Sequence, residues 1–128
     1  MKKGATYMAT WNLQGTTHHV LICNGGSCMR KGGEEVTQAI RDEIDRLQLN
    51  GRVHTTRTRC NGRCEDACVV IVYPEGVWYR TIDEQIGRDI VRNHVRDGNI
   101  LRDYVTYTYE HTGFVMPEHS VVTRGKEK

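Results

Sequence analysis

The chain of 128 residues lacks any apolar run long enough to cross a bilayer, which takes about 20 consecutive residues. Its first stretch, MKKGATYMATWNL, is basic but lacks the apolar segment of a secretory signal peptide. Internal repeats and low-complexity blocks are missing too. We therefore expect a cytoplasmic protein without membrane contact, built as one domain over residues 1–128 with its core at about 18–100 and extended polar ends.

A strong net charge is also missing, since the 18 Lys and Arg residues are nearly balanced by 16 Asp and Glu residues. A balance so close to zero gives no support for a nucleic-acid partner. Hydrophobic residues make up 38% of the chain, which suffices for a modest core.

Two common cysteine motifs are absent. No C-x-x-C pair occurs, so thioredoxin-type dithiol exchange has little support, and no Cys-x-His pair occurs, which argues against a Rieske centre. The cysteine spacings also differ from the common bacterial and plant-type ferredoxin runs. The count of five is odd, and a reducing cytosol disfavours disulfides, so the cysteines are expected to bind metal or to react.

The five cysteines fall into two groups, each in a loop after an expected strand. Cys23 and Cys28 stand in VLICNGGSCMRKGG with C-x4-C spacing, and Cys60, Cys64 and Cys68 stand in TRTRCNGRCEDACVV with C-x3-C steps. The first loop, 23–33, is rich in glycine, which permits positive φ angles and close backbone approach. Both properties suit a loop that wraps an inorganic group.

Hydrophobic periodicity predicts six elements, and the ends remain irregular. They are a strand at 18–22, a helix at 34–49, strands at 52–59, 69–73 and 77–80, and a helix at 81–97. Asn50-Gly51 is expected to stop the first helix, and Thr81 with Glu84 has the spacing of a capping box. Residues 1–16 read as irregular, and the tail from Asn99 as an extended, partly loose end despite the strand propensity of 104–109.

The order β-α-β-β-β-α predicts an α/β fold of thioredoxin-like arrangement. We expect a four-stranded mixed sheet with flanking helices, one on either face. Both cysteine loops would follow the first two parallel strands at their carboxyl ends, where open α/β sheets place ligand sites.

Four thiolates brought together select zinc or iron–sulfur. A [2Fe–2S] cluster takes two cysteines on each iron, which two separate pairs would supply, but a closed zinc site accepts the same spacings. A zinc-stabilised binding module and a thiol-based redox protein therefore remain alternatives. Cys68 begins an apolar strand, which favours a buried core residue, but it could also be a fifth or alternative ligand, or help to hold a [4Fe–4S] cluster.

The stretch CNGRCEDACVVIVYPEGVWY, followed by TIDEQIGRDIVRNHVRDGNI, resembles the thioredoxin-like [2Fe–2S] ferredoxins. The paired C-x4-C and C-x3-C motifs are also similar to the small thioredoxin-fold subunit of respiratory complex I. The likeness covers about residues 18–100. The loop CNGGSCMRKGGEEV further resembles a ferredoxin encoded with anaerobic cobalamin-biosynthesis enzymes. Cys68 is a departure, because these ferredoxins commonly carry proline there.

The resemblance implies that Cys23, Cys28, Cys60 and Cys64 bind a [2Fe–2S] cluster. It also implies an electron carrier rather than an enzyme, a redox partner protein, a homodimer and a link to cobalamin biosynthesis. Five cations lie in or beside the two loops: Arg30, Lys31, Arg57, Arg59 and Arg63. Such cations would favour the reduced cluster and steer an acidic partner.

Overall fold

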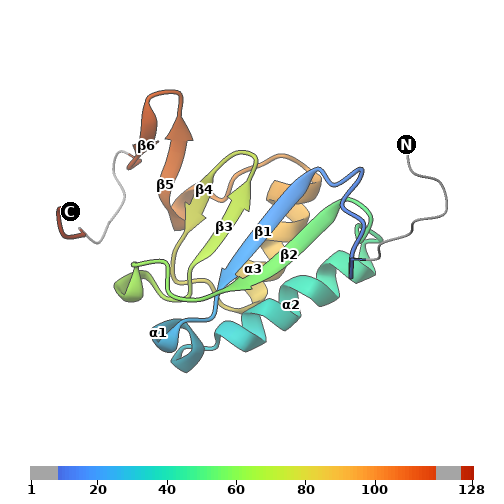
Figure 1. The fold of residues 1–128 in the computed structure, drawn as a ribbon, viewed down its shortest axis with the longest axis horizontal. Coiled ribbons are helices and arrows are strands. Elements are labelled where there is room, and N and C mark those ends of the chain that lie inside the picture. Colours follow the sequence, from blue (N-terminus) through green and yellow to red (C-terminus); the bar gives the residue numbers. More distant parts are fainter. Residues whose placement is uncertain (1–8, 118–124) are drawn as a thin grey trace.

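The computed structural model describes residues 9–117 and 125–128 (Figure 1). The strands are β1 (His18–Cys23), β2 (Val53–Thr58), β3 (Val70–Tyr73), β4 (Val77–Tyr79), β5 (Val105–Glu110) and β6 (Gly113–Val115). The helices are α1 (Gly26–Arg30), α2 (Gly33–Arg46) and α3 (Glu84–Asp89), which continues as the π-helical segment η2 (Ile90–Arg96). Single 3-10 turns occupy Cys64–Asp66 and Arg102–Tyr104. Residues 9–16 form no helix or strand, as expected, whereas that expectation for residues 1–8 lies outside the described residues.

The strands form one mixed sheet in the order β2-β1-β3-β4-β5-β6. The β1–β2 pair is parallel and every other pair is antiparallel, so the thioredoxin-like α/β core is confirmed. The predicted number of four strands is wrong, because the described residues contain six.

The two unpredicted strands come from the segment that the sequence marked as a loose end. The open edge of β4 pairs with β5, through Trp78 opposite Tyr107, and β5 then turns back into β6. Gly113 has φ +138°, which glycine adopts readily, and it starts β6 after the turn. In Figure 1 this β5–β6 hairpin rises beyond the rest of the sheet.

The first long helix is amphipathic, as predicted. Its buried stripe contains Val36, Ala39, Ile40 and Ile44. The helix ends at Arg46, short of the predicted 49, and the left-handed residue after it is Gln48 with φ +57° rather than Gly51. The backbone of Gln48 thus takes the left-handed conformation that the sequence analysis expected of Gly51.

Helices α2 and α3 pack against each other, so the expectation of one helix on each face of the sheet is wrong. A Cβ atom on Gly87 in α3 would meet Cγ1 of Ile40 in α2 at 3.1 Å. An ion pair of 2.8 Å between Arg92 and Glu43 joins η2 to α2. The lack of a side chain at Gly87 allows this close approach, and a helix pair in contact cannot straddle a sheet.

The start of α3 also differs from the sequence expectation. Asp83 is the N-cap, and its carboxylate accepts a hydrogen bond of 2.8 Å from the backbone N–H of Ile86. Thr81 has φ +50° and lies outside the helix, so the capping box of Thr81 with Glu84 does not form. Gly98, with φ +81°, follows the helical segment, which ends at Arg96, one residue before the predicted end at 97.

The sheet brings three chain segments to one edge. In the parallel β1–β2 pair, Cys23 lies opposite Thr58, so the loops after both strands start side by side. β3 runs antiparallel to β1 and begins with Val70 opposite Ile22 at the same edge. No helix in the described part of the chain is long and apolar enough to cross a membrane.

Candidate metal centre

The four cysteines predicted as ligands meet at this edge. Cys23 is the last residue of β1, Cys28 lies in α1, and Cys60 and Cys64 lie in the turn that follows β2. All four line one small cavity, together with Gly25, Ser27 and Arg63. The helical turn α1 was expected to be loop, and it folds Cys28 back toward Cys23.

The sulfur atoms are arranged as two pairs. The Sγ atoms of Cys60 and Cys64 lie 3.5 Å apart and both residues are exposed, whereas Cys23 and Cys28 are buried and the Cys28 thiol donates to Cys23. Within the described residues no three His, Cys, Asp or Glu side chains converge on one point as ligands of a single ion. Two pairs of thiolates that face one cavity suit a two-iron cluster, in which each iron takes two sulfurs from the protein.

Several N–H groups point at these sulfur atoms. The backbone N–H of Gly62 donates to Cys60 Sγ over 3.3 Å, and the backbone N–H groups of Gly25 and Asn61 donate to Cys23. The backbone N–H of Val69 donates to Cys28. Hydrogen bonds to the sulfurs stabilise negative charge there, which is the chemistry that an iron–sulfur cluster needs from its surroundings.

The pKa values of the two buried thiols shift in opposite directions. Burial raises the pKa of the Cys28 thiol to about 12, helped by its hydrogen bond to Cys23 and opposed by the N–H of Val69. Burial also raises the pKa of Cys23, but the donors at Gly25, Cys28 and Asn61 outweigh it, so the pKa of Cys23 falls below its ordinary value. Cys23 is therefore the buried sulfur best prepared to be a thiolate.

Gly25 lets the two cysteine loops come together. A Cβ atom at this position would lie 2.7 Å from the Cα and the backbone nitrogen of Cys60, which real Cβ contacts do not allow. The expectation that glycine permits close backbone approach in this loop is thus confirmed at Gly25.

Cys68 is not among the residues that line the cavity. It is 1% exposed, and its thiol donates to the backbone carbonyls of Cys28 at 3.4 Å and Lys31 at 3.3 Å. Burial, followed by the charges of Cys23 and Glu35, raises the pKa of Cys68. The favoured expectation of a buried core position agrees with this placement.

Two of the five cations beside the site form ion pairs with neighbouring carboxylates. Arg57 pairs with Glu34 at 2.6 Å on the surface, and Arg63 pairs with Asp66 at 2.7 Å in a mostly buried place. In the sequence Arg63 is one cation among five, and no motif gives Tyr107 a role at the site. Their contact is long-range, with the Arg63 guanidinium 5.1 Å from the centre of the Tyr107 ring, so sequence spacing could not reveal it.

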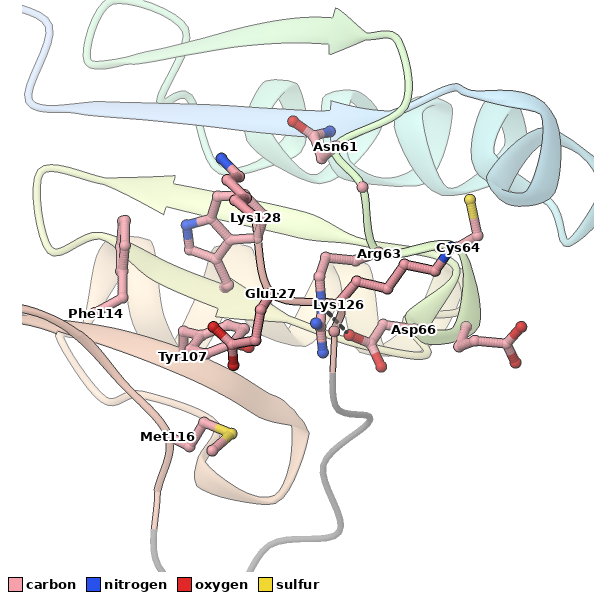
Figure 2. A pocket seen from close by; sticks show the side chains of 14 residues that line it. Asn61, Arg63, Cys64, Asp66, Tyr107, Phe114, Met116, Lys126, Glu127 and Lys128 are labelled. Atoms are coloured by element: carbon pink, nitrogen blue, oxygen red, sulfur yellow. Dashed lines mark hydrogen bonds and ion pairs between the residues drawn. The ribbon is translucent and has the colours of Figure 1, made fainter.

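A groove of about 900 Å³ opens beside Cys64, between its turn and the β4–β5–β6 part of the sheet (Figure 2). Its apolar lining consists of Trp78, Tyr107, Phe114 and Met116. Residues 125–128 and the charged side chains of Arg63, Glu65 and Asp66 complete it. The cysteine cavity is therefore closed beside the buried Cys23 and opens beside the exposed Cys64 onto this groove.

The chain shares its sequence and fold with known proteins. The family model for the thioredoxin-like [2Fe-2S] ferredoxins matches residues 4–94. A protein of Priestia megaterium, provisionally named a 2Fe-2S ferredoxin, is 55% identical over 121 residues, which are 94% of each chain. A 2Fe-2S ferredoxin of Clostridium pasteurianum is 32% identical over 93 residues, covering 66% of this chain and 91% of the relative.

A solved structure gives the same picture. The thioredoxin-like [2Fe-2S] ferredoxin of Aquifex aeolicus superposes with a TM-score of 0.70 at 31% identity, covering 74% of this chain and 94% of that one. The family supports the [2Fe–2S] expectation over the zinc and [4Fe–4S] alternatives, and the paired thiolates with their N–H donors fit such a cluster. The chain belongs to the thioredoxin-like [2Fe-2S] ferredoxins, a family of iron–sulfur electron-transfer proteins.

Proposed function

We propose that Cys23, Cys28, Cys60 and Cys64 hold the [2Fe–2S] cluster of this ferredoxin, and that the protein carries single electrons to a partner in the cytoplasm. The observation that carries the ligand assignment is the single cavity that these four side chains line. Two solved variants of the Aquifex ferredoxin each replace a cysteine by serine, at positions four residues apart. Cys60 and Cys64 have the same separation.

When bound, such a cluster takes up and releases one electron. The chain supplies the surroundings in which this happens. The buried Cys23 and Cys28 keep water from one side of the cavity, and the N–H groups at Gly25 and Gly62 stabilise charge on the sulfurs. The exposed Cys60 and Cys64 form the side through which an electron enters and leaves.

The proposed partner is an acidic redox protein. Arg30, Lys31 and Arg59 are exposed positions beside the cysteines, and positive charge there would increase the rate of encounter with an acidic surface. We also propose that the protein is a homodimer. We further propose that it serves anaerobic cobalamin biosynthesis, because the loop from Cys23 to Val36 resembles that of a ferredoxin encoded with those enzymes. A strain without this chain is expected to make less cobalamin anaerobically, and an undiminished yield would remove that part of the proposal.

The ligand assignment is tested by replacing each of the four cysteines with alanine. Each variant is expected to lose or change the visible absorption of the anaerobically purified protein, because each sulfur supplies one of four bonds to iron. Cys68→Ala is the matched control and keeps the spectrum. A variant at one of the four positions with a full, unchanged spectrum shows that this cysteine is not a ligand.

Electron transfer is tested by anaerobic redox titration. The holoprotein is expected to take up one electron per cluster reversibly and to reduce an added one-electron acceptor. If the iron keeps one oxidation state throughout, or if reduction cannot be reversed, the carrier role is wrong.

A further inference from the structure

Arg63 stands between the cysteine cavity and the groove, because its side chain lines both. Its Nε atom donates to Oδ2 of Asp66 over 2.7 Å, and the two side chains are only 11% and 3% exposed. Figure 2 shows the Arg63 side chain directed at Asp66, in the space between the turn that carries Cys64 and the strand that carries Tyr107.

The backbone fixes both members of this pair. The N–H of Asp66 donates to the carbonyl of Arg63 over 2.9 Å, within the 3-10 turn that begins at Cys64. The carbonyl of Asp66 accepts a hydrogen bond of 2.8 Å from the N–H of Thr81. A guanidinium and a carboxylate are thus held beside an iron ligand, largely out of water.

Charges in such a place act strongly on a nearby redox group. Water screens them poorly, so each interacts with the sulfur atoms more than a surface charge would. Net charge around an iron–sulfur cluster is one of the factors that set its reduction potential. Arg63 favours an added electron and Asp66 opposes it, so the balance depends on how the pair is held.

Tyr107 contributes to holding the pair. Its ring lies 5.1 Å from the Arg63 guanidinium, within the range of a cation–π contact. Tyr107 belongs to β5, which lies beyond the residues 4–94 that the family model matches. The β5–β6 hairpin therefore contacts the electron-transfer site through Arg63.

We propose that Arg63 and Asp66 are an opposed charge pair that sets the reduction potential of the bound cluster, and that Tyr107 positions Arg63 for this role. The inference rests on the proposed function. Arg63 and Asp66 have opposite effects on the potential, and the hairpin influences it through the contact of Tyr107 with Arg63.

The test is a redox titration of four purified holoproteins: wild type, Arg63→Gln, Asp66→Asn and the double variant. Arg63→Gln is expected to lower the potential because it leaves the carboxylate unbalanced, and Asp66→Asn to raise it. The double variant is expected to return close to wild type. Arg96→Gln is the matched control, because it breaks an exposed ion pair with Asp97 outside the cysteine cavity, and its potential stays that of wild type.

Shifts of the same sign in the two single variants, or no shift in either, overturn the inference. If Arg63→Gln fails to hold iron, Asp66→Asn decides alone, since the inference requires it to raise the potential. Arg63→Lys keeps the charge and is expected to keep most of the wild-type potential. A wild-type chain that holds no [2Fe–2S] cluster would instead overturn the proposed function, and this inference with it.

The positioning role of Tyr107 is tested by the same redox titration, on variants whose iron content equals that of wild type. Tyr107→Phe keeps a ring under the guanidinium and is expected to keep the potential. Tyr107→Leu removes the ring and is expected to change it. Equal potentials for wild type and Tyr107→Leu overturn the positioning role of Tyr107.

Discussion

The thiol of Cys68 donates to the backbone carbonyl of Cys28, 3.4 Å away, and so connects the segment before β3 to the helical turn that carries a proposed ligand. The side chain is 1% exposed and packs within the hydrophobic core. A cysteine in this place supports the shape of the site without joining the four sulfurs that line the cavity.

Cys68→Ala is therefore expected to keep the iron content and the electron paramagnetic resonance spectrum of a reduced [2Fe–2S] centre. The substitution leaves a cavity about the size of one sulfur atom in the core, and we expect this cavity to lower the free energy of unfolding by about 1–2 kcal/mol. Iron analysis and the spectrum check this directly. A halved iron content or a different cluster signal would make Cys68 a ligand.

Gly25→Ala is expected to separate the two cysteine loops, because the new Cβ would lie 2.7 Å from backbone atoms of Cys60. We expect a lower iron content per chain and a loss of stability of about 1–3 kcal/mol. Gly51→Ala is the matched control, since nothing lies within 4 Å of a Cβ built there. Equal iron content in the two variants would show that the close approach at Gly25 is not needed for binding.

Much of this fold could be predicted from local patterns. Runs of apolar residues predicted β1, β3 and β4, and apolar residues spaced three and four apart predicted α2. The strand–helix–strand order then predicted that the two cysteine loops would share one edge of the sheet. These inferences succeed because hydrophobic period and crossover handedness act on neighbouring segments.

Features that depend on distant contacts were not predictable. The strand β5 forms because β4 offers an unpaired edge, and the pattern of residues 104–109 alone could not tell whether a partner exists. The contact of α2 with α3 depends on Gly87 meeting Ile40, far apart in the sequence. The pairing of Arg63 with Asp66 is local, but its burial beside Tyr107 required the hairpin that the sequence left as a loose end.

Glu43 joins α2 to the segment that follows α3, since its carboxylate accepts from Arg46 at 2.7 Å and from Arg92 at 2.8 Å. The hydrogen bond from Arg46, with that from Arg92, lowers the pKa of Glu43 to about 2. Glu43→Gln is expected to lower the free energy of unfolding by about 1–3 kcal/mol. Denaturant unfolding at neutral pH measures this.

Asp42→Asn on the exposed face of α2 serves as the control for Glu43→Gln, and it should change stability by less than about 0.5 kcal/mol. Equal stability of the two variants would contradict the bridging role of Glu43.

His94 is expected to make the stability depend on pH. It is 1% exposed, between the hydroxyl of Tyr79 and the carboxylate of Glu75, which also faces His18. Burial lowers the pKa of His94 below 6.5, although Glu75 partly opposes this. The unfolded chain therefore binds this proton at a higher pH than the folded chain does.

The stability that His94 contributes is fully present above pH 6.5 and falls as the pH drops below that value toward the folded pKa. Thermal unfolding of wild type and His94→Gln between pH 5.5 and 8 checks this, and the variant is expected to lose part of the slope. His111 is exposed, so His111→Gln is the control and is expected to keep the wild-type slope. Identical slopes in wild type and His94→Gln would contradict the assignment.

The homodimer is expected to appear in solution as a species of about twice the chain mass of 14.7 kDa. Sedimentation equilibrium of the anaerobic holoprotein over a range of concentrations measures this mass. A single-chain mass at every concentration would contradict it.

The central claim is that the paired cysteines at the edge of this sheet hold a [2Fe–2S] cluster, and metal and sulfide analysis of the anaerobically purified chain tests it most directly. Iron and acid-labile sulfide are each expected at about two atoms per chain, with no zinc in proportion to protein. Reduction is expected to give the paramagnetic signal of a single two-iron centre. A zinc-loaded, colourless protein, or four irons per chain, would contradict the account.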